Sequence, residues 1–317
     1  METRTMAKDI GHIVILLALI GSVVFLFTWT GVIKCNIIPG WCDAYWFIVR
    51  GGEPRILIVS GDFGMGNPDL LEQTLRDPTH AGAITTQAHI DRITLGNLQE
   101  FDLVIVERAR QMETAKLRMF MDYVDSGGRL VWTGDAGVEL GREKQYPGNQ
   151  TIEDEYLFED EDPNLDSNVH RMIGPWARKE GTRIVPFHEF LGVQYETNYC
   201  SIKECTGRPW QGVLITNPSR DHPLVYALRP NLVLRGDFAI VTDVSGSITT
   251  RALTLDWFSE LIGQDQLNYG RTFPLITTSG YGERIAYYAV PPEQFVAEDL
   301  EEKYYSIVEN VYYGMLR

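Results

Sequence analysis

The stretch 102–135 reads DLVIVERARQMETAKLRMFMDYVDSGGRLVWTGD. It contains two short apolar runs, 102–107 and 129–134, on either side of the segment 113–126, whose apolar residues recur at helical spacing. An uninterrupted apolar run is typical of a strand buried on both faces, and a glycine pair ends a helix. A strand, a helix and a second strand in this order predict a βαβ unit with parallel strands.

The same alternation extends outward from this unit. Towards the N-terminus, the pattern predicts a strand at 55–60, a helix at 68–76 that begins at Pro68, and a strand at 83–90. Further strands are predicted at 183–187, 212–216, 232–235, 238–243 and 252–255, a hairpin at 272–278 and 283–290, and a helix at 299–316. The predicted fold class is α/β, with a mostly parallel flavodoxin-like sheet and flanking helices.

An acid-rich stretch at about 138–182 interrupts the alternation and is interpreted as an insertion. Oxygen-bearing side chains recur there at every second position, as in calcium-binding loops, at Asp160, Asp162, Asn164 and Asp166. The glycine and the glutamate of such loops are replaced by Leu165 and Arg171. A solvated acidic loop is therefore the first interpretation and a Ca²⁺ site the alternative, and no cofactor is predicted.

The segment from Ile13 to Ile33 contains 21 residues without a charge. At about 1.5 Å per residue, it spans about 30 Å as a helix, which is the thickness of a bilayer core. A cleavable signal peptide usually has a shorter apolar region and a small-residue cleavage site, so a transmembrane helix is predicted. The predicted organisation is a cytoplasmic N-terminus at 1–12, a transmembrane helix at 13–33, a stem and linker at 34–54, and an α/β domain at 55–317.

Charges around this helix favour a cell-membrane protein with the N-terminus in the cytoplasm and the C-terminal domain outside. Arg4 and Lys8 precede the helix, whereas only Lys34 follows it closely. Two cysteine pairs, Cys35 with Cys42 and Cys200 with Cys205, predict local disulfides in an oxidising compartment, with free thiols or a metal site as alternatives. Asn149 begins a candidate glycosylation triplet.

The formal net charge of −15 bears on the partners. A strongly acidic surface repels phosphate backbones, so a nucleic-acid partner is not expected. The expected partners are the bilayer, through the apolar helix, and another protein or a membrane complex.

Several phrases between 55 and 317 resemble one family. They are the strand 55–60 with its glycine-rich loop, the pair 102–107 and 123–135, the phrase 190–193, and the closing phrases 281–288 and 308–313. In this order they resemble the class I glutamine amidotransferase-like superfamily, specifically its trehalose-utilisation-type and membrane-associated relatives. The resemblance implies the fold of that superfamily.

The resemblance does not extend to the reaction. Enzymes of the superfamily use a cysteine nucleophile on a sharp turn after a strand, with a histidine and a carboxylate behind it. Here the turn after the fourth predicted strand carries Asp135, and all four cysteines lie elsewhere. The family's histidine–any–glutamate triplet is also absent, because His188 is followed directly by Glu189 and His222 by Pro223. The chain is more simply interpreted as a non-enzyme.

Two aspartates nevertheless follow predicted parallel strands, where α/β sheets bind ligands: Asp62 and Asp135. Together with His188 or His222 they are the candidate catalytic residues, and the alternative is that each aspartate caps a turn. The candidate ligand-binding residues are Gly61, Asp62, Gly64, Gly66 and Asp135. The glycine-rich loop matches no established phosphate-binding motif.

Three functions remain in view. The first is a membrane-anchored, non-catalytic binding or assembly module exposed outside the membrane. The second is a hydrolase that acts on a sugar or another small polar substrate. The third is an accessory subunit of a membrane complex, in which Gly21, Ser22 and Gly31 would allow close packing against other helices.

Overall fold

The computed structural model describes residues 2–30, 32–38, 40–141, 155–158, 172–202, 214–216, 222–226, 228, 237–256, 272–297, 300 and 302–316. The chain divides into two compact units, Met1–Pro54 with Arg317, and Arg55–Leu316. The boundary between them follows Gly51 and Gly52.

The N-terminal unit consists of α1 (Glu2–Trp29), η1 (Cys35–Ile37) and α2 (Trp41–Arg50). Within α1, the 20 residues Ile10–Trp29 are long and apolar enough to cross a bilayer, and most of them are exposed, Thr28 being buried. By length and composition this segment is a membrane anchor or a signal sequence.

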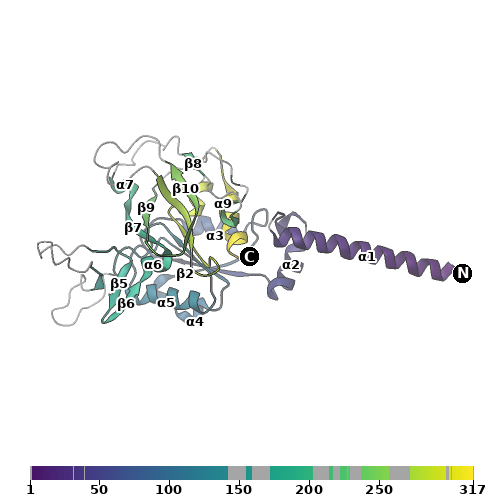
Figure 1. Cartoon of the computed structure of the whole chain (residues 1–317), viewed down its shortest axis with the longest axis horizontal. Coiled ribbons are helices and arrows are strands. Elements are labelled where there is room, and N and C mark those ends of the chain that lie inside the picture. Colours follow the sequence, from purple (N-terminus) through teal and green to yellow (C-terminus); the bar gives the residue numbers. More distant parts are fainter. Residues whose placement is uncertain are drawn as a thin grey trace, which may run out of the picture. The chain divides into compact units, whose positions relative to one another are not determined.

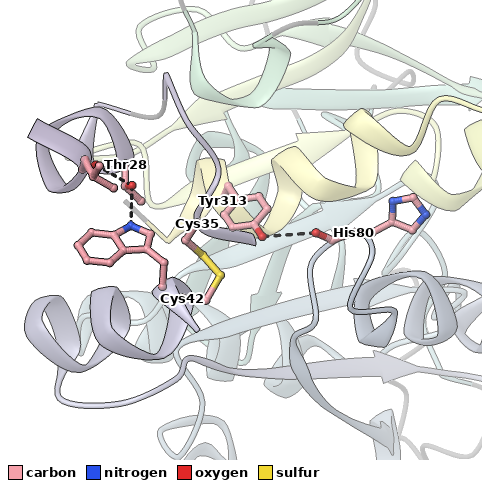
Figure 2. Close-up of a disulfide and its surroundings, with 7 residues drawn as sticks. Thr28, Cys35, Cys42, His80 and Tyr313 are labelled. Atoms are coloured by element: carbon pink, nitrogen blue, oxygen red, sulfur yellow. Dashed lines mark hydrogen bonds between the residues drawn. A yellow bond between two sulfur atoms is a disulfide. The ribbon is translucent and has the colours of Figure 1, made fainter. Parts of the chain in front are cut away.

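A disulfide fixes the turn between the two helices of this unit. Cys35 is bonded to Cys42, with Cα atoms 4.8 Å apart (Figure 2). The Trp41 indole N–H donates to Thr28 Oγ1 at 2.9 Å, and the rings of Phe25 and Tyr45 lie 5.7 Å apart. These contacts join the start of α2 to the end of α1. The disulfide confirms the first of the two predicted cysteine pairings.

The second unit is built on an eight-stranded sheet of order β2-β1-β3-β4-β12-β11-β10-β8. Its strands are β1 (Arg55–Ser60), β2 (Ile84–His89), β3 (Leu103–Glu107), β4 (Leu130–Thr133), β8 (Leu214–Thr216), β10 (Thr249–Asp256), β11 (Thr272–Ser279) and β12 (Ile285–Tyr288). The first five strands in the order are parallel and the last three pairings are antiparallel. An α/β fold with parallel strands in the flavodoxin-like order is therefore confirmed.

Helices cover both faces of the parallel strands. The helices are α3 (Pro68–Arg76), α4 (Leu95–Leu98), α5 (Thr114–Asp125), α6 (Phe187–Leu191), α7 (Tyr199–Ile202) and α9 (Tyr305–Met315), and the 3-10 turns are η2 (Ile90–Arg92), η4 (Pro223–Val225) and η5 (Pro292–Val296). Figure 1 shows α4 and α5 together on one face, and α3 and α9 on the other.

Local chemistry explains where these helices begin and end. The Asn67 side chain accepts from Leu70 N–H at 3.3 Å, and Pro68 occupies the first turn of α3. After α5, a Cβ at Gly128 would lie 2.2 Å from the Tyr123 ring. Only glycine fits beside this buried ring, whose hydroxyl donates to the Phe101 carbonyl at 3.0 Å.

The middle of the chain differs from the expected continuation of the sheet. The predicted strand 183–187 is β6 (Arg183–Pro186), which pairs with β5 (Ala177–Glu180) in a separate two-stranded sheet. The predicted strand 238–243 is β9 (Ala239–Asp243), which pairs with β7 (Val193–Asn198). The final helix begins at Tyr305, later than expected, because residues 302–304 are not helical.

Candidate functional site

Four parallel strands of the main sheet, β1 to β4, bring several charged residues to one edge. β1 ends at Ser60, which is paired in register with His89 of β2 and Glu107 of β3. The loops that follow these strands carry Asp62 and Arg108, and the turn after β4 carries Asp135. The carboxyl edge is where open α/β sheets bind ligands.

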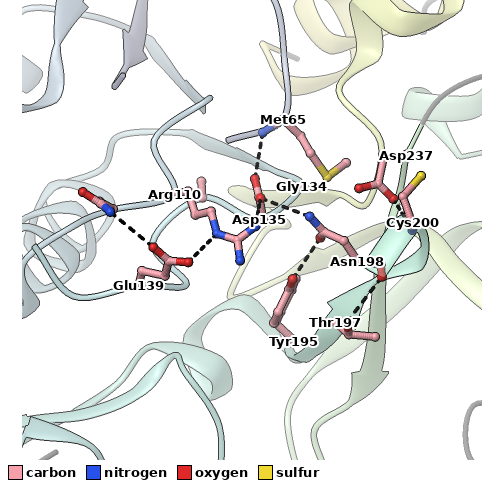
Figure 3. A network of polar contacts seen from close by, with 12 residues as sticks. Met65, Arg110, Gly134, Asp135, Glu139, Tyr195, Thr197, Asn198, Cys200 and Asp237 are labelled. Carbon is pink, nitrogen blue, oxygen red and sulfur yellow. Dashed lines mark hydrogen bonds and ion pairs between the residues drawn. The ribbon is translucent and has the colours of Figure 1, made fainter. Parts of the chain in front are cut away.

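Asp135 is buried and fully engaged by its neighbours (Figure 3). Its side chain is 1% exposed. Oδ1 accepts from Met65 N–H at 2.8 Å, and Oδ2 accepts from the Arg110 guanidinium and from Asn198 Nδ2, each at 3.2 Å. Three separate segments donate to this carboxylate, so it joins them and is not open to a substrate.

A second layer of polar contacts surrounds this carboxylate. Arg110 Nε donates to Glu139 Oε1 at 2.8 Å, and the Tyr195 hydroxyl donates to Asn198 Oδ1 at 2.9 Å. Burial raises the pKa of Tyr195, so this phenol stays protonated and keeps its donor role. Burial alone would lower the pKa of Arg110. The hydrogen bond to Glu139 and the charge of Asp135 outweigh the effect of burial, so the pKa of Arg110 is raised.

The glycine-rich loop packs closely on this network. A Cβ at Gly64 would lie 3.0 Å from Asp135 Oδ1, and a Cβ at Gly66 would lie 3.1 Å from Glu107 Oε2. Both glycines have positive φ, at +123° and +118°. Backbone bonds from Arg108 N–H to Met65 O (2.7 Å) and from Arg110 N–H to Phe63 O (2.8 Å) hold the loop against the strand end. These glycines therefore allow close approach to buried carboxyls.

The strained turn at this edge follows β3. Arg108 has φ +50°, a conformation that costs an ordinary side chain about 1 kcal/mol or more. The turn after β4 corresponds to the turn that carries the nucleophile in the enzymes of the resembled superfamily. In this chain its positive-φ positions are glycines, Gly134 and Gly137. The side chain displayed on the strained turn is an exposed guanidinium, which is not a nucleophile.

A cleft of about 530 Å³ opens beside the network, between the ends of β1, β2 and β3. Asp62, Phe63, His89, Asp91, Glu113 and Lys116 are among its lining residues. His89 lies between two carboxylates, with Nε2 3.5 Å from Asp62 Oδ1 and Nδ1 3.2 Å from Asp91 Oδ2. The volume of the cleft is that of a small-molecule site.

His89 was not singled out from the sequence, where it lacks metal-ligand spacing. The position of His89 follows from the pairing of β1 with β2, which sets Ser60 beside His89. Asp62 and Asp91 each lie two residues further along their chain segments, and both reach His89 at the same edge. The available signal was that His89 lies near the end of the predicted strand 83–90. Asp62 thus has a histidine neighbour, although not one of the two that were proposed.

The other two candidate histidines lie in different surroundings. His188 is buried and its Nε2 is 3.9 Å from Glu189 Oε1, and burial lowers its pKa. His222 Nε2 is 3.2 Å from Glu283 Oε2, and its Nδ1 accepts from Leu224 N–H. Within the described ranges, neither histidine has a hydrogen bond or ion pair with Asp62 or Asp135.

The remaining predicted sites are only partly covered. Asp160, Asp162, Asn164, Asp166, Asn149 and Cys205 lie outside the described residues. Cys200 is disulfide-bonded. In the part of the chain that the structure describes, no group of three or more histidine, cysteine, aspartate or glutamate side chains is arranged to hold a metal ion.

Comparison with known proteins adds structural likenesses at low identity. No family model matches the chain, and no curated protein matches it. A ThuA-like protein from Bacteroides uniformis is 15% identical with a TM-score of 0.49, and the match covers 82% of this chain and 91% of that one. The N-terminal domain of mmIFT52 is 11% identical with a TM-score of 0.47, covering 83% and 96%. A β-galactosidase from Rahnella sp. R3 is 14% identical with a TM-score of 0.47, covering 82% of this chain and 30% of the enzyme. At these identities and TM-scores, the likenesses do not assign the chain to a family.

Proposed function

We propose that this chain is a membrane-anchored binding module without catalytic activity, which takes a small polar ligand in the cleft beside Asp62. The observation that carries the proposal is the state of Asp135. A nucleophile or general base needs a lone pair that can reach the substrate. Asp135 is 1% exposed and accepts three hydrogen bonds, so it serves as a structural carboxylate.

The charge of the cleft indicates the class of ligand. Its walls carry three carboxylates, on Asp62, Asp91 and Glu113, against a single ammonium on Lys116. That ammonium is already directed at backbone carbonyls, with Ile93 O at 2.7 Å and Asp91 O at 3.4 Å. The three carboxylates, two of which contact His89, therefore outnumber the fixed positive charge of the cleft, and a ligand with a positive charge would find acceptors there.

Phe63 adds an apolar surface to the same cleft, and its side chain is 62% exposed. An aromatic face attracts an organic cation, with a gain of about 0.5–1 kcal/mol at an exposed site. The combination of carboxylates and an exposed ring favours an organic amine over a phosphate or another anion.

The N-terminal unit supports the proposed location of the module. Retained in the mature chain, the apolar helix Ile10–Trp29 would anchor the domain, and the positive residues before it favour an extracytoplasmic location. The Cys35–Cys42 disulfide supports the same side of the membrane, because disulfides persist in oxidising compartments.

Ligand binding can be tested on the full chain in detergent micelles, with spermidine as the cationic compound and a neutral disaccharide and inorganic phosphate as comparisons. Spermidine is expected to bind, and Asp62→Asn and Asp91→Asn are each expected to weaken binding several-fold. Asp125→Asn on α5 removes an equal charge from an exposed position away from the cleft lining and is the matched control.

Equal weakening by the control and the two cleft variants would show only general attraction to an acidic protein. Preference for phosphate would contradict the ligand class. Turnover of an ester or glycoside that is lost in Asp135→Asn would contradict the non-catalytic assignment itself.

A further inference from the structure

Two buried carboxyl groups face one another at the end of β3, outside the network around Asp135. Glu107 is the last residue of β3, and Glu293 lies in η5. Both side chains are 0% exposed, and Glu293 lies close enough to act electrostatically on the Glu107 carboxyl. Two adjacent ionised carboxylates without water would repel each other strongly.

The donors around this pair are too few to support two negative charges. Asn67 N–H donates to Glu293 Oε1 at 2.7 Å. Among the described residues, no other group donates to the remaining three oxygens, Oε1 and Oε2 of Glu107 and Oε2 of Glu293. A proton held between the two carboxyls supplies the missing donor, because a protonated carboxyl donates to a carboxylate.

The charged groups nearby do not replace that proton. Arg108 follows Glu107 and has an exposed side chain, and Asp69 on α3 adds a further negative charge near Glu107. On the elements packed against η5, Glu72 of α3 is paired with Arg76 at 2.9 Å and Glu309 of α9 with His80 at 2.9 Å.

We propose that Glu107 and Glu293 share one proton near neutral pH and act as a proton-dependent lock that holds η5 and the glycine-rich loop 61–67 against the end of β3. The loop contacts both partners of the lock. Asn67 N–H binds Glu293, and Gly66 lies against Glu107. Loss of the shared proton leaves two buried charges together and loosens both segments.

The titration of the pair agrees in direction with this arrangement. Burial, followed by the charge of Glu293, raises the pKa of Glu107 well above its usual value. Burial also raises the pKa of Glu293 to about 7, against the opposing effects of the Asn67 N–H, of the N–H of Glu293 itself and of Glu107. The lock is therefore closed in weakly acidic and neutral solution and opens as the pH rises, independently of any ligand in the cleft.

Hydrogen exchange of the full chain in micelles tests the lock between pH 5 and pH 8. The measured quantity is the local opening constant of amides in 64–67 and 292–297, in the wild type and in Glu107→Gln. An amide is a neutral donor and stands in for the protonated carboxyl. The ratio of the wild-type constant to the variant constant is expected to rise by up to about tenfold per pH unit as the shared proton is lost.

Asp125→Asn on α5 is the matched control, because it removes an exposed charge that does not act on either glutamate; its ratio to the wild type should stay constant with pH. A constant ratio for Glu107→Gln would overturn the proposal. If that variant does not fold, Glu293→Gln is measured in the same way. Failure of both variants to fold would also overturn it, since neutral stand-ins should preserve the closed state.

Discussion

Asp135 and the pair formed by Glu107 and Glu293 are buried to the same degree at the same edge of the sheet, yet their surroundings differ. Asp135 accepts three hydrogen bonds, one of them from a guanidinium. Of the four oxygens of the glutamate pair, Glu293 Oε1 accepts from Asn67 N–H, and the other three have no hydrogen-bond partner among the described residues. The difference teaches that burial alone does not decide the charge of a carboxyl. The number of donors aimed at it does.

The largest expected effect comes from removing the saturated carboxylate. Asp135→Leu leaves the Met65 amide and the Asn198 side chain without their acceptor and breaks the ion pair with Arg110, which is 34% exposed. We expect the free energy of unfolding to fall by about 3 kcal/mol, measured by urea denaturation in micelles. A loss below about 1 kcal/mol would contradict a structural role for this side chain.

Removing one carboxyl of the glutamate pair should raise the free energy of unfolding at alkaline pH, whereas removing Asp135 should lower it. Because the folded state raises both pKa values above about 4.3, the usual value for glutamate, it binds more protons than the unfolded state. The contribution of the pair is therefore fully present below about pH 4.3 and is lost as the pH rises through about 7.

Glu107→Gln should remove this loss. We expect the variant to gain stability relative to the wild type between pH 5 and pH 8, reaching about 2 kcal/mol. Denaturation at several pH values measures the gain. A variant that is less stable than the wild type at every pH would show that Glu107 is ionised and satisfied, as Asp135 is.

Substitutions in the glycine-rich loop, which packs against these carboxyls, should change the free energy of unfolding by a smaller amount. Gly64→Ala and Gly66→Ala each place a Cβ within 3.1 Å of a carboxyl oxygen and strain a backbone of positive φ. Each should cost about 1–3 kcal/mol in unfolding free energy. Gly82→Ala is the control, because the φ of Gly82 is +63° and a Cβ there would lie 3.5 Å from the nearest atom, the Cα of Pro78. Equal losses at all three positions would mean that backbone strain alone is responsible.

The smallest effect is expected from an ion pair outside the buried edge. Arg251 and Asp243 form a salt bridge with exposed fractions of 42% and 39%. Arg251→Ala should lower the unfolding free energy by about 0.5 kcal/mol or less, because water and salt screen such pairs. A loss as large as that of Asp135→Leu would remove the contrast between exposed and buried carboxylates.

Much of the parallel half of the fold could be predicted from the sequence. The strands 55–60 and 102–107 are uninterrupted apolar runs, and α3 carries its own start signals in Asn67 and Pro68. The strands β5, β6, β7 and β9 are short or mixed in polarity, and which strand pairs with which depends on contacts between distant residues. Local patterns therefore located β6 and β9, but not β5 and β7 or the sheets that these strands form.

The site was predicted less completely. Asp62 and Asp135 were found because they follow strands, but the cleft partner His89 depends on the pairing of β1 with β2. Glu293 lies in a proline-containing turn, 292–296, where a glutamate is usually exposed. Nothing in its local sequence indicates that Asn67 and Glu107, both far away along the chain, lie beside it. The positive φ of Arg108 likewise has no sequence signal.

The most direct test of this contrast is infrared spectroscopy of the full chain near neutral pH, which distinguishes a protonated carboxyl from a carboxylate by its carbonyl-stretch band. We expect the band of a buried protonated carboxyl in the wild type. This band should be absent in Glu107→Gln and present in Asp135→Asn. A band that persists in Glu107→Gln and disappears in Asp135→Asn would contradict this expectation, because the proton would then reside on the carboxyl described here as a saturated anion.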